Sequence, residues 1–187
     1  EQVIRDTKAA GAKRIILVAH SMGTALTMEM LRQSDFKDPG WSARTLDSVL
    51  LIAPDLSVDL FASQIRDLSR VPQPFGVMVS EKDAVLSVSA MLRGNIATGR
   101  LGNIASAERL EDLPVEVIDI TEFASDATVG HLVAATSPSL IAMIRSTEQI
   151  NQSFEEPQES FLGQLFPPNQ TSLLQNGKIR ISRSNER

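Results

Sequence analysis

The sequence predicts an α/β fold with about four parallel strands and flanking helices. Four apolar runs of strand length lie at residues 14–19, 46–53, 75–80 and 115–120, and helix-like segments separate them. Strands that alternate with helical patterns are typical of parallel sheets. A length of 187 residues suits one domain that can bury a real core.

The elements before and after the first strand have clear helical signals. Residues 1–10 predict a helix that ends near Gly11. The run 14–19 (RIILVA) is apolar and β-branched, which is typical of a fully buried strand and too short for a helix. Residues 22–33 are rich in good helix formers, and apolar side chains recur every four positions at Met22, Leu26 and Met30.

Later segments are predicted in the same way. Ser57 has the character of an N-cap for a core-facing helix, in which Val58, Phe61, Ile65 and Leu68 lie at helical spacing. A short helix is expected over 105–110, and Ser137 and Pro138 predict the start of another over 139–150. Residues 1–150 are expected to form the domain. The polar residues 151–187 are expected to form a largely flexible tail, whose apolar piece 161–166 docks locally.

The junction of the first strand and its helix holds the most informative residue. Ser21 lies in Ala19-His20-Ser21-Met22-Gly23, with small residues two positions before and two positions after it. This pattern between a strand and a helix predicts a nucleophile elbow, a turn so sharp that the flanking positions leave no room for large side chains. Alanine stands at position 19 where the usual pattern has glycine.

A serine nucleophile needs a base, and the chain has two histidines. His20 abuts Ser21, and neighbouring side chains at a strand end diverge, so we interpret His20 as a packing or hydrogen-bonding residue that supports the site. His131 follows the strand at 115–120 and precedes the helix at 139–150. It is therefore predicted on a loop at the carboxyl end of a strand, where the site residues of open α/β sheets collect.

The acid is expected between the serine and the histidine in the chain, after a strand of its own. Asp83 follows the run 75–80 and is our first choice. Asp55 follows the run 46–53 and an Ala-Pro turn, and is the second. The remaining alternatives are three further carboxylates: Glu81, Glu122 and Asp126.

The chain order Ser, Asp, His is that of α/β-hydrolases. The segments IILVAHSMGTALTMEML, VLLIAPDLSVDLF, VSEKDAVLS and VIDI, followed by His131, resemble an uncharacterised bacterial, esterase/lipase-like branch of that superfamily over about residues 1–145. The resemblance implies Ser21 as nucleophile, Asp83 as acid, His131 as base, the Met22 N–H as an oxyanion donor and a supporting place for Asp55.

The resemblance implies an enzyme that cleaves esters or related acyl substrates through an acyl-enzyme, without a cofactor. Thioesterase, amidase or acyltransferase chemistry would use the same residues. In the resembled fold, the elbow strand is the fifth of eight. We therefore expect this chain to be the C-terminal half of an α/β-hydrolase sheet, without the loop that supplies the second oxyanion donor. Weak activity and self-association through the exposed apolar edge at 15–19 would follow. The alternative is a non-enzymatic protein-interaction module.

Composition narrows the classes of partner. The net charge of −5 argues against nucleic acid, and no basic face is visible in residues 1–145. Without cysteine there is no disulfide and no thiolate metal site, and two histidines at unrelated positions make a zinc centre implausible. The glycines at 94, 99 and 102 lack the context of a phosphate loop. No signal peptide or membrane-spanning run is visible, and the sequence leaves the compartment open.

Overall fold

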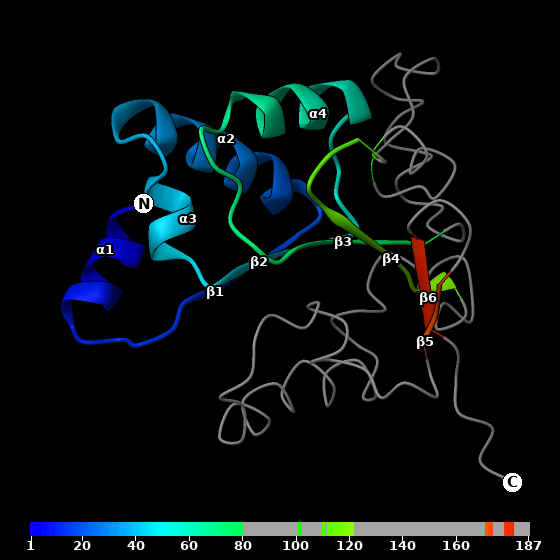
Figure 1. The fold of residues 1–187 in the computed structure, drawn as a ribbon, viewed down its shortest axis with the longest axis horizontal. Helices are drawn as coiled ribbons and strands as arrows, with labels where there is room; N and C mark the ends of the chain where they lie inside the picture. Colours follow the sequence, from blue (N-terminus) through cyan, green and yellow to red (C-terminus); the bar gives the residue numbers. More distant parts are fainter. Residues whose placement is uncertain (81–100, 102–109, 111, 122–170, 174–177, 182–187) are drawn as a thin grey trace, which may run out of the picture.

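The computed structural model describes residues 1–80, 101, 110, 112–121, 171–173 and 178–181, and Figure 1 shows their arrangement. The elements in chain order are α1 (Gln2–Ala9), β1 (Ile16–His20), α2 (Met22–Lys37), α3 (Trp41–Thr45), β2 (Ser48–Ile52), α4 (Val58–Asp67), β3 (Phe75–Val79), β4 (Glu116–Asp119), β5 (Thr171–Leu173) and β6 (Lys178–Ile181).

The strands form one sheet in the order β1-β2-β3-β4-β6-β5. The first four are the four predicted strands, and each pairs in parallel with the next. The predicted fold class, a parallel sheet with flanking helices, is therefore confirmed. No strand was predicted in 151–187, yet β6 pairs in parallel with β4, and β5 pairs antiparallel with β6.

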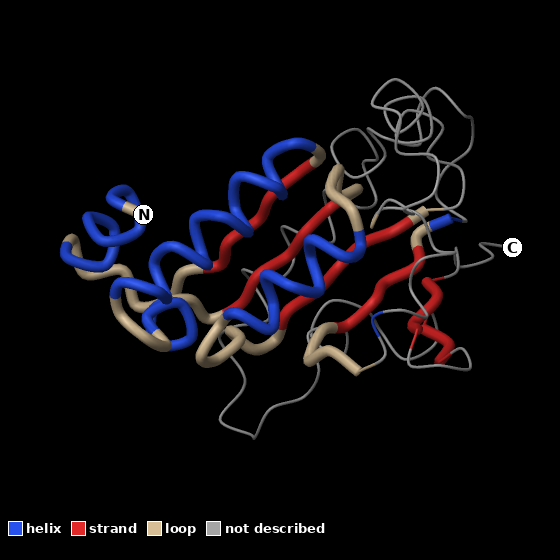
Figure 2. Tube along the Cα trace, turned by 90° about the horizontal axis from the view of Figure 1, so that it is seen from above, coloured by secondary structure: helices blue, strands red, loops and turns tan. Residues whose placement is uncertain are grey.

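Two helices cover one face of the sheet. In Figures 1 and 2, α2 and α4 lie on the same side of the strands, with α3 beyond the end of α2. The cause is topological. The strands β1, β2 and β3 are neighbours in the order of the chain. Right-handed crossovers between such strands place their connecting helices on the same face.

The core lies between this face and the helices. Every residue of β2 and β3 is buried, as expected for near-continuous apolar runs in the centre of a parallel sheet. Alternate strand residues join the helices in one apolar cluster, in which the rings of Phe61 on α4 and Phe75 on β3 lie 6.1 Å apart. The cluster includes Val49, Leu51, Val77 and Val79 from the strands and Met28, Leu31, Val58 and Ile65 from the helices.

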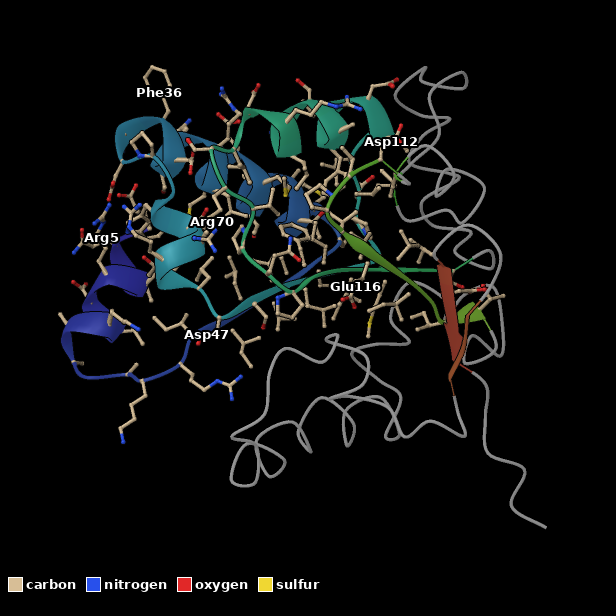
Figure 3. All side chains as sticks on the ribbon, in the orientation of Figure 1. Arg5, Phe36, Asp47, Arg70, Asp112 and Glu116 are labelled. Atoms are coloured by element: carbon tan, nitrogen blue, oxygen red, sulfur yellow. The ribbon has the colours of Figure 1, made fainter. Side chains whose placement is uncertain are left out.

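The strand that leads to Ser21 differs from its neighbours. β1 lies at one end of the described sheet, and its Ile16 and Val18 side chains are 41% and 45% exposed. The expectation of an exposed apolar edge is confirmed for the described strands, whereas the expectation of a fully buried strand is wrong. Asp47, labelled in Figure 3, fixes the start of β1: Ile15 N–H donates to Asp47 Oδ2 (2.7 Å), and Asp47 N–H donates to Ile15 O (2.9 Å).

The predicted helix signals are largely confirmed. α1 ends before Gly11, which has a φ of 94°. Ser57 caps α4 by accepting a hydrogen bond from Leu60 N–H. α2 continues past the predicted residue 33 to Lys37, and the short α3 was not predicted. The helices expected at 105–110 and 139–150, the three later glycines and the apolar piece at 161–166 lie outside the described residues, except for Leu110.

In the part of the chain that the structure describes, no helix is long and apolar enough to cross a bilayer.

Candidate active site

Ser21 occupies a strained turn between β1 and α2. It follows His20, the last residue of β1, and precedes Met22, the first residue of α2. Its φ of 53° and ψ of −129° lie outside the regions that residues with a Cβ ordinarily occupy. Such strain persists only when the surrounding structure enforces it, and it clusters at functional sites. The backbone at Ser21 therefore has the conformation expected of a nucleophile elbow.

Three neighbouring segments hold the backbone of Ser21. Its N–H donates to Ile52 O at the end of β2 (3.0 Å). Its carbonyl oxygen accepts from Thr24 N–H (3.0 Å), from Thr24 Oγ1 (2.6 Å) and, at a longer distance, from Asp55 N–H (3.4 Å). The next strand and the first turn of α2 thus enforce the strained conformation.

The side chain of Ser21 does not cap the helix that follows. A serine at an N-cap usually accepts a hydrogen bond from the second or third helical N–H, and Ser21 makes no such side-chain bond. Met22 is the first helical residue, so its N–H has no acceptor within the helix and belongs to the positive end of the helix dipole. A hydroxyl and a backbone donor therefore lie next to each other in the chain, as acyl transfer requires.

A second unusual turn follows β2 beside the elbow. Ala53 has a φ of 45°, and its N–H donates to Met78 O on β3 (3.1 Å). Two residues later, Asp55 is buried, and its N–H reaches the Ser21 carbonyl. The structure therefore brings Asp55 and Ser21 together. The family resemblance implied a supporting place for Asp55, and the role of its side chain stays a prediction.

His20 ends β1 opposite Ile52 and is partly buried. Asp83 and His131 lie outside the described residues, as do Glu81, Glu122 and Asp126. The strands that precede these residues in the chain, β3 and β4, are described. β3 ends at Val79 before the buried Ser80, and β4 ends at Asp119. The carboxyl ends of parallel strands share one edge, so both segments leave the sheet at the edge that holds Ser21.

Two residues near this edge were not found from the sequence. Thr24 is fully buried and bonds the Ser21 carbonyl, as described above. Asp119 is also fully buried, and its Oδ1 accepts a hydrogen bond from Thr121 N–H (2.9 Å). The only available signals were a threonine in the first helical turn and an acidic residue inside the apolar run VIDI.

The position two residues after Ser21 has room for a Cβ atom. A Cβ built on Gly23 would meet no neighbouring atom within 4 Å beyond its own helix. An alanine-sized side chain therefore fits at position 23 among the described residues, and the expectation that large side chains find no room there stays a prediction.

Within the described ranges, no three histidine or acidic side chains gather as a metal site would require.

In a comparison with protein-family models, residues 1–147 match the family described as alpha/beta hydrolase of unknown function (DUF900). A search of curated proteins found no match, and a search of solved structures found none.

Proposed function

The chain belongs to this family of alpha/beta hydrolases, and from that premise we propose that it is a serine hydrolase acting on carboxylic esters. The observation that carries the proposal is the backbone of Ser21, strained at φ 53° between β1 and α2 and held by β2 and α2. A turn of this kind raises the serine hydroxyl above the carboxyl edge of the sheet. Retaining it costs about 1–3 kcal/mol, which favours a functional reason for the strain.

In the proposed mechanism, His131 accepts the proton of the Ser21 hydroxyl as Oγ attacks the ester carbonyl carbon. The carbonyl oxygen becomes an oxyanion that accepts a hydrogen bond from Met22 N–H. The C–O bond to the alcohol then breaks, and the imidazolium returns the proton to the leaving alkoxide. Water attacks the acyl-enzyme with His131 again as base, which releases the acid and restores Ser21.

The proposed acid is Asp83, which would accept a hydrogen bond from the imidazole and stabilise the imidazolium. The alternative acid is Asp55, which is buried and contacts the elbow through its backbone. The two assignments predict different variants. If Asp83 is the acid, Asp83→Asn lowers kcat by about 10⁴-fold, whereas Asp55→Asn has a smaller effect through the support of the elbow. If Asp55 is the acid, the order is reversed.

The experiment is hydrolysis of p-nitrophenyl esters of increasing acyl-chain length, with Ser21→Ala as the background. Turnover that disappears in Ser21→Ala and in His131→Gln supports the proposal. The matched control is His20→Gln, which changes the neighbouring imidazole and should retain most of the activity, because His20 has a supporting role and is not the proposed base. Equal turnover in the wild type and Ser21→Ala would refute the proposed nucleophile.

A second candidate is a protein-interaction module without catalysis, and the apolar edge of β1 favours it. Ile16 and Val18 are exposed on a strand that has one described neighbour. Unpaired strand edges are templates for pairing with another chain. Ser21→Ala separates the two functions, because an enzyme loses turnover and keeps its partners, whereas a module is unaffected.

A further inference from the structure

The Ser21–Met22 peptide unit connects the elbow to the proposed oxyanion donor. A trans peptide is planar, so the carbonyl of Ser21 and the N–H of Met22 point in opposite directions. Whatever fixes the carbonyl therefore also fixes the direction of the N–H. The donors to this carbonyl are Thr24 N–H, Thr24 Oγ1 and Asp55 N–H, at 3.0, 2.6 and 3.4 Å.

We propose that Thr24 is a positioning residue for catalysis, whose hydroxyl orients the Met22 N–H toward the oxyanion. The inference rests on the proposed function. The Thr24 hydroxyl makes the shortest of the three bonds to the carbonyl, and the residue is fully buried, so solvent does not compete for the bond. It acts through the peptide unit and does not contact the substrate.

The hydroxyl also strengthens the donor. A hydrogen bond accepted by a carbonyl polarises its peptide group, and the N–H on the other side becomes a better donor. An oxyanion forms only in the transition state and the tetrahedral intermediate, so this gain appears in kcat and not in substrate binding. A threonine hydroxyl that bonds a carbonyl three residues earlier also has a purely structural role in many helices. The two roles predict different kinetics.

The test compares Thr24→Val and Thr24→Ala, which remove the hydroxyl, with Thr24→Ser, which keeps it. We expect loss of the hydroxyl to lower kcat by about tenfold with KM unchanged, the equivalent of one buried hydrogen bond. The inhibition constant of a trifluoromethyl ketone, which forms a tetrahedral adduct, should rise by the same factor. Thr24→Ser should restore both quantities.

The controls separate folding from orientation. Thr27→Val changes a second threonine of α2, which is partly buried, and should leave kcat unchanged. Fluorescence of the single tryptophan, Trp41, reports the folded fraction of each variant. Thr24→Ala removes volume without adding a bulky group, so it tests the proposal if Thr24→Val fails to fold.

The outcomes are distinct. Folded Thr24→Ala with wild-type kcat and wild-type inhibition would overturn the positioning role and leave the proposed hydrolase intact. A loss of activity that only follows the lost folded fraction would overturn it as well. Ester turnover by the wild type that Ser21→Ala does not reduce would overturn the proposed function and this inference together.

Discussion

Replacing Asp35 by asparagine should destabilise the junction of three helices at the C-terminal end of α2. Asp35 lies near the end of α2 and is 2% exposed. Its Oδ1 accepts from Gly40 N–H at the start of α3 (2.7 Å). Its Oδ2 accepts from Ser69 N–H (2.8 Å) and from the Ser69 hydroxyl (2.6 Å), just after α4. One buried carboxylate thus ties the ends of these helices together.

The magnitude follows from the donors. An asparagine in the same place keeps the two Ser69 bonds if its oxygen replaces Oδ2, but its NH₂ group then faces Gly40 N–H. The unpaired N–H costs about 1–3 kcal/mol, and two bonds change from a charged to a neutral acceptor. Removal of the buried charge relieves its desolvation cost and offsets part of this loss. The net loss in the free energy of unfolding should therefore be about 2–4 kcal/mol.

The pH dependence has a definite sign. Burial alone would raise the pKa of Asp35, but hydrogen bonds from Ser69 and Gly40 and the charge of Arg44 outweigh it, and the pKa is lowered from 3.8. A carboxylate with a lowered pKa contributes stability above its unfolded pKa and loses it as the pH falls through the folded value. The stability difference between wild type and Asp35→Asn should therefore be constant near neutral pH and shrink below about pH 4.

The assay is urea unfolding followed by the fluorescence of Trp41, which is buried next to Gly40. The matched control is Asp38→Asn, whose carboxylate pairs with Arg44 at the surface and should contribute less than about 1 kcal/mol. A loss below about 0.5 kcal/mol in Asp35→Asn would show that the buried carboxylate does not hold this junction, since a surface substitution gives as much. A difference that widens in acid would refute the assigned charge.

Three further predictions concern α2, α4 and the edge of the sheet. The pKa of Glu29 is lowered to about 2, and the largest cause is its hydrogen bonding with Arg32. The midpoint of its titration, followed by carbon-13 NMR, should therefore rise in Arg32→Gln. An unchanged midpoint would contradict this. Ser57→Ala should cost about 1 kcal/mol in urea unfolding through loss of the α4 cap, and a neutral result would mean that the cap contributes nothing. The wild type should self-associate with rising concentration in sedimentation velocity, and Val18→Lys should suppress this; a wild type that stays monomeric would exclude edge pairing.

The central sheet was predictable because its signals are local. β2 and β3 are continuous apolar runs, and such runs of strand length form buried parallel strands. The start of α4 was predictable because Ser57 precedes an amphipathic segment. These patterns involve only residues that are close together in the chain, so the sequence alone is enough to recognise them.

The end of α2 and the strand β6 were not predicted, because both depend on contacts between residues that are distant in the sequence. The last turn of α2 is polar apart from the exposed Phe36, and its Asp35 is buried with hydrogen-bond donors from Gly40 and Ser69. β6 is a short segment in a polar tail that gains its place by pairing with β4. Neither contact produces a periodic pattern in the sequence. Tertiary contacts, and not local propensity, therefore determine the structure of these two segments.

The site divides in the same way. The strained turn at Ser21 was predictable from a strand, a serine and a helix in succession. The contact of Asp55 with the elbow requires the parallel register of β1 and β2, which no local pattern fixes. The role of Thr24 has no signal of its own, because a threonine in a helix is common. The assignments of Asp83 and His131 stay predictions.

The most direct test of the nucleophile is to locate a fluorophosphonate adduct by peptide mapping. Cleavage after Arg14 and Arg32 releases residues 15–32, a peptide in which Ser21 is the one serine. We predict that the intact protein gains one adduct, that fragmentation places it on Ser21, and that Ser21→Ala prevents it. An adduct on another residue, or no adduct on the folded protein, would contradict the assignment of Ser21 as an activated nucleophile.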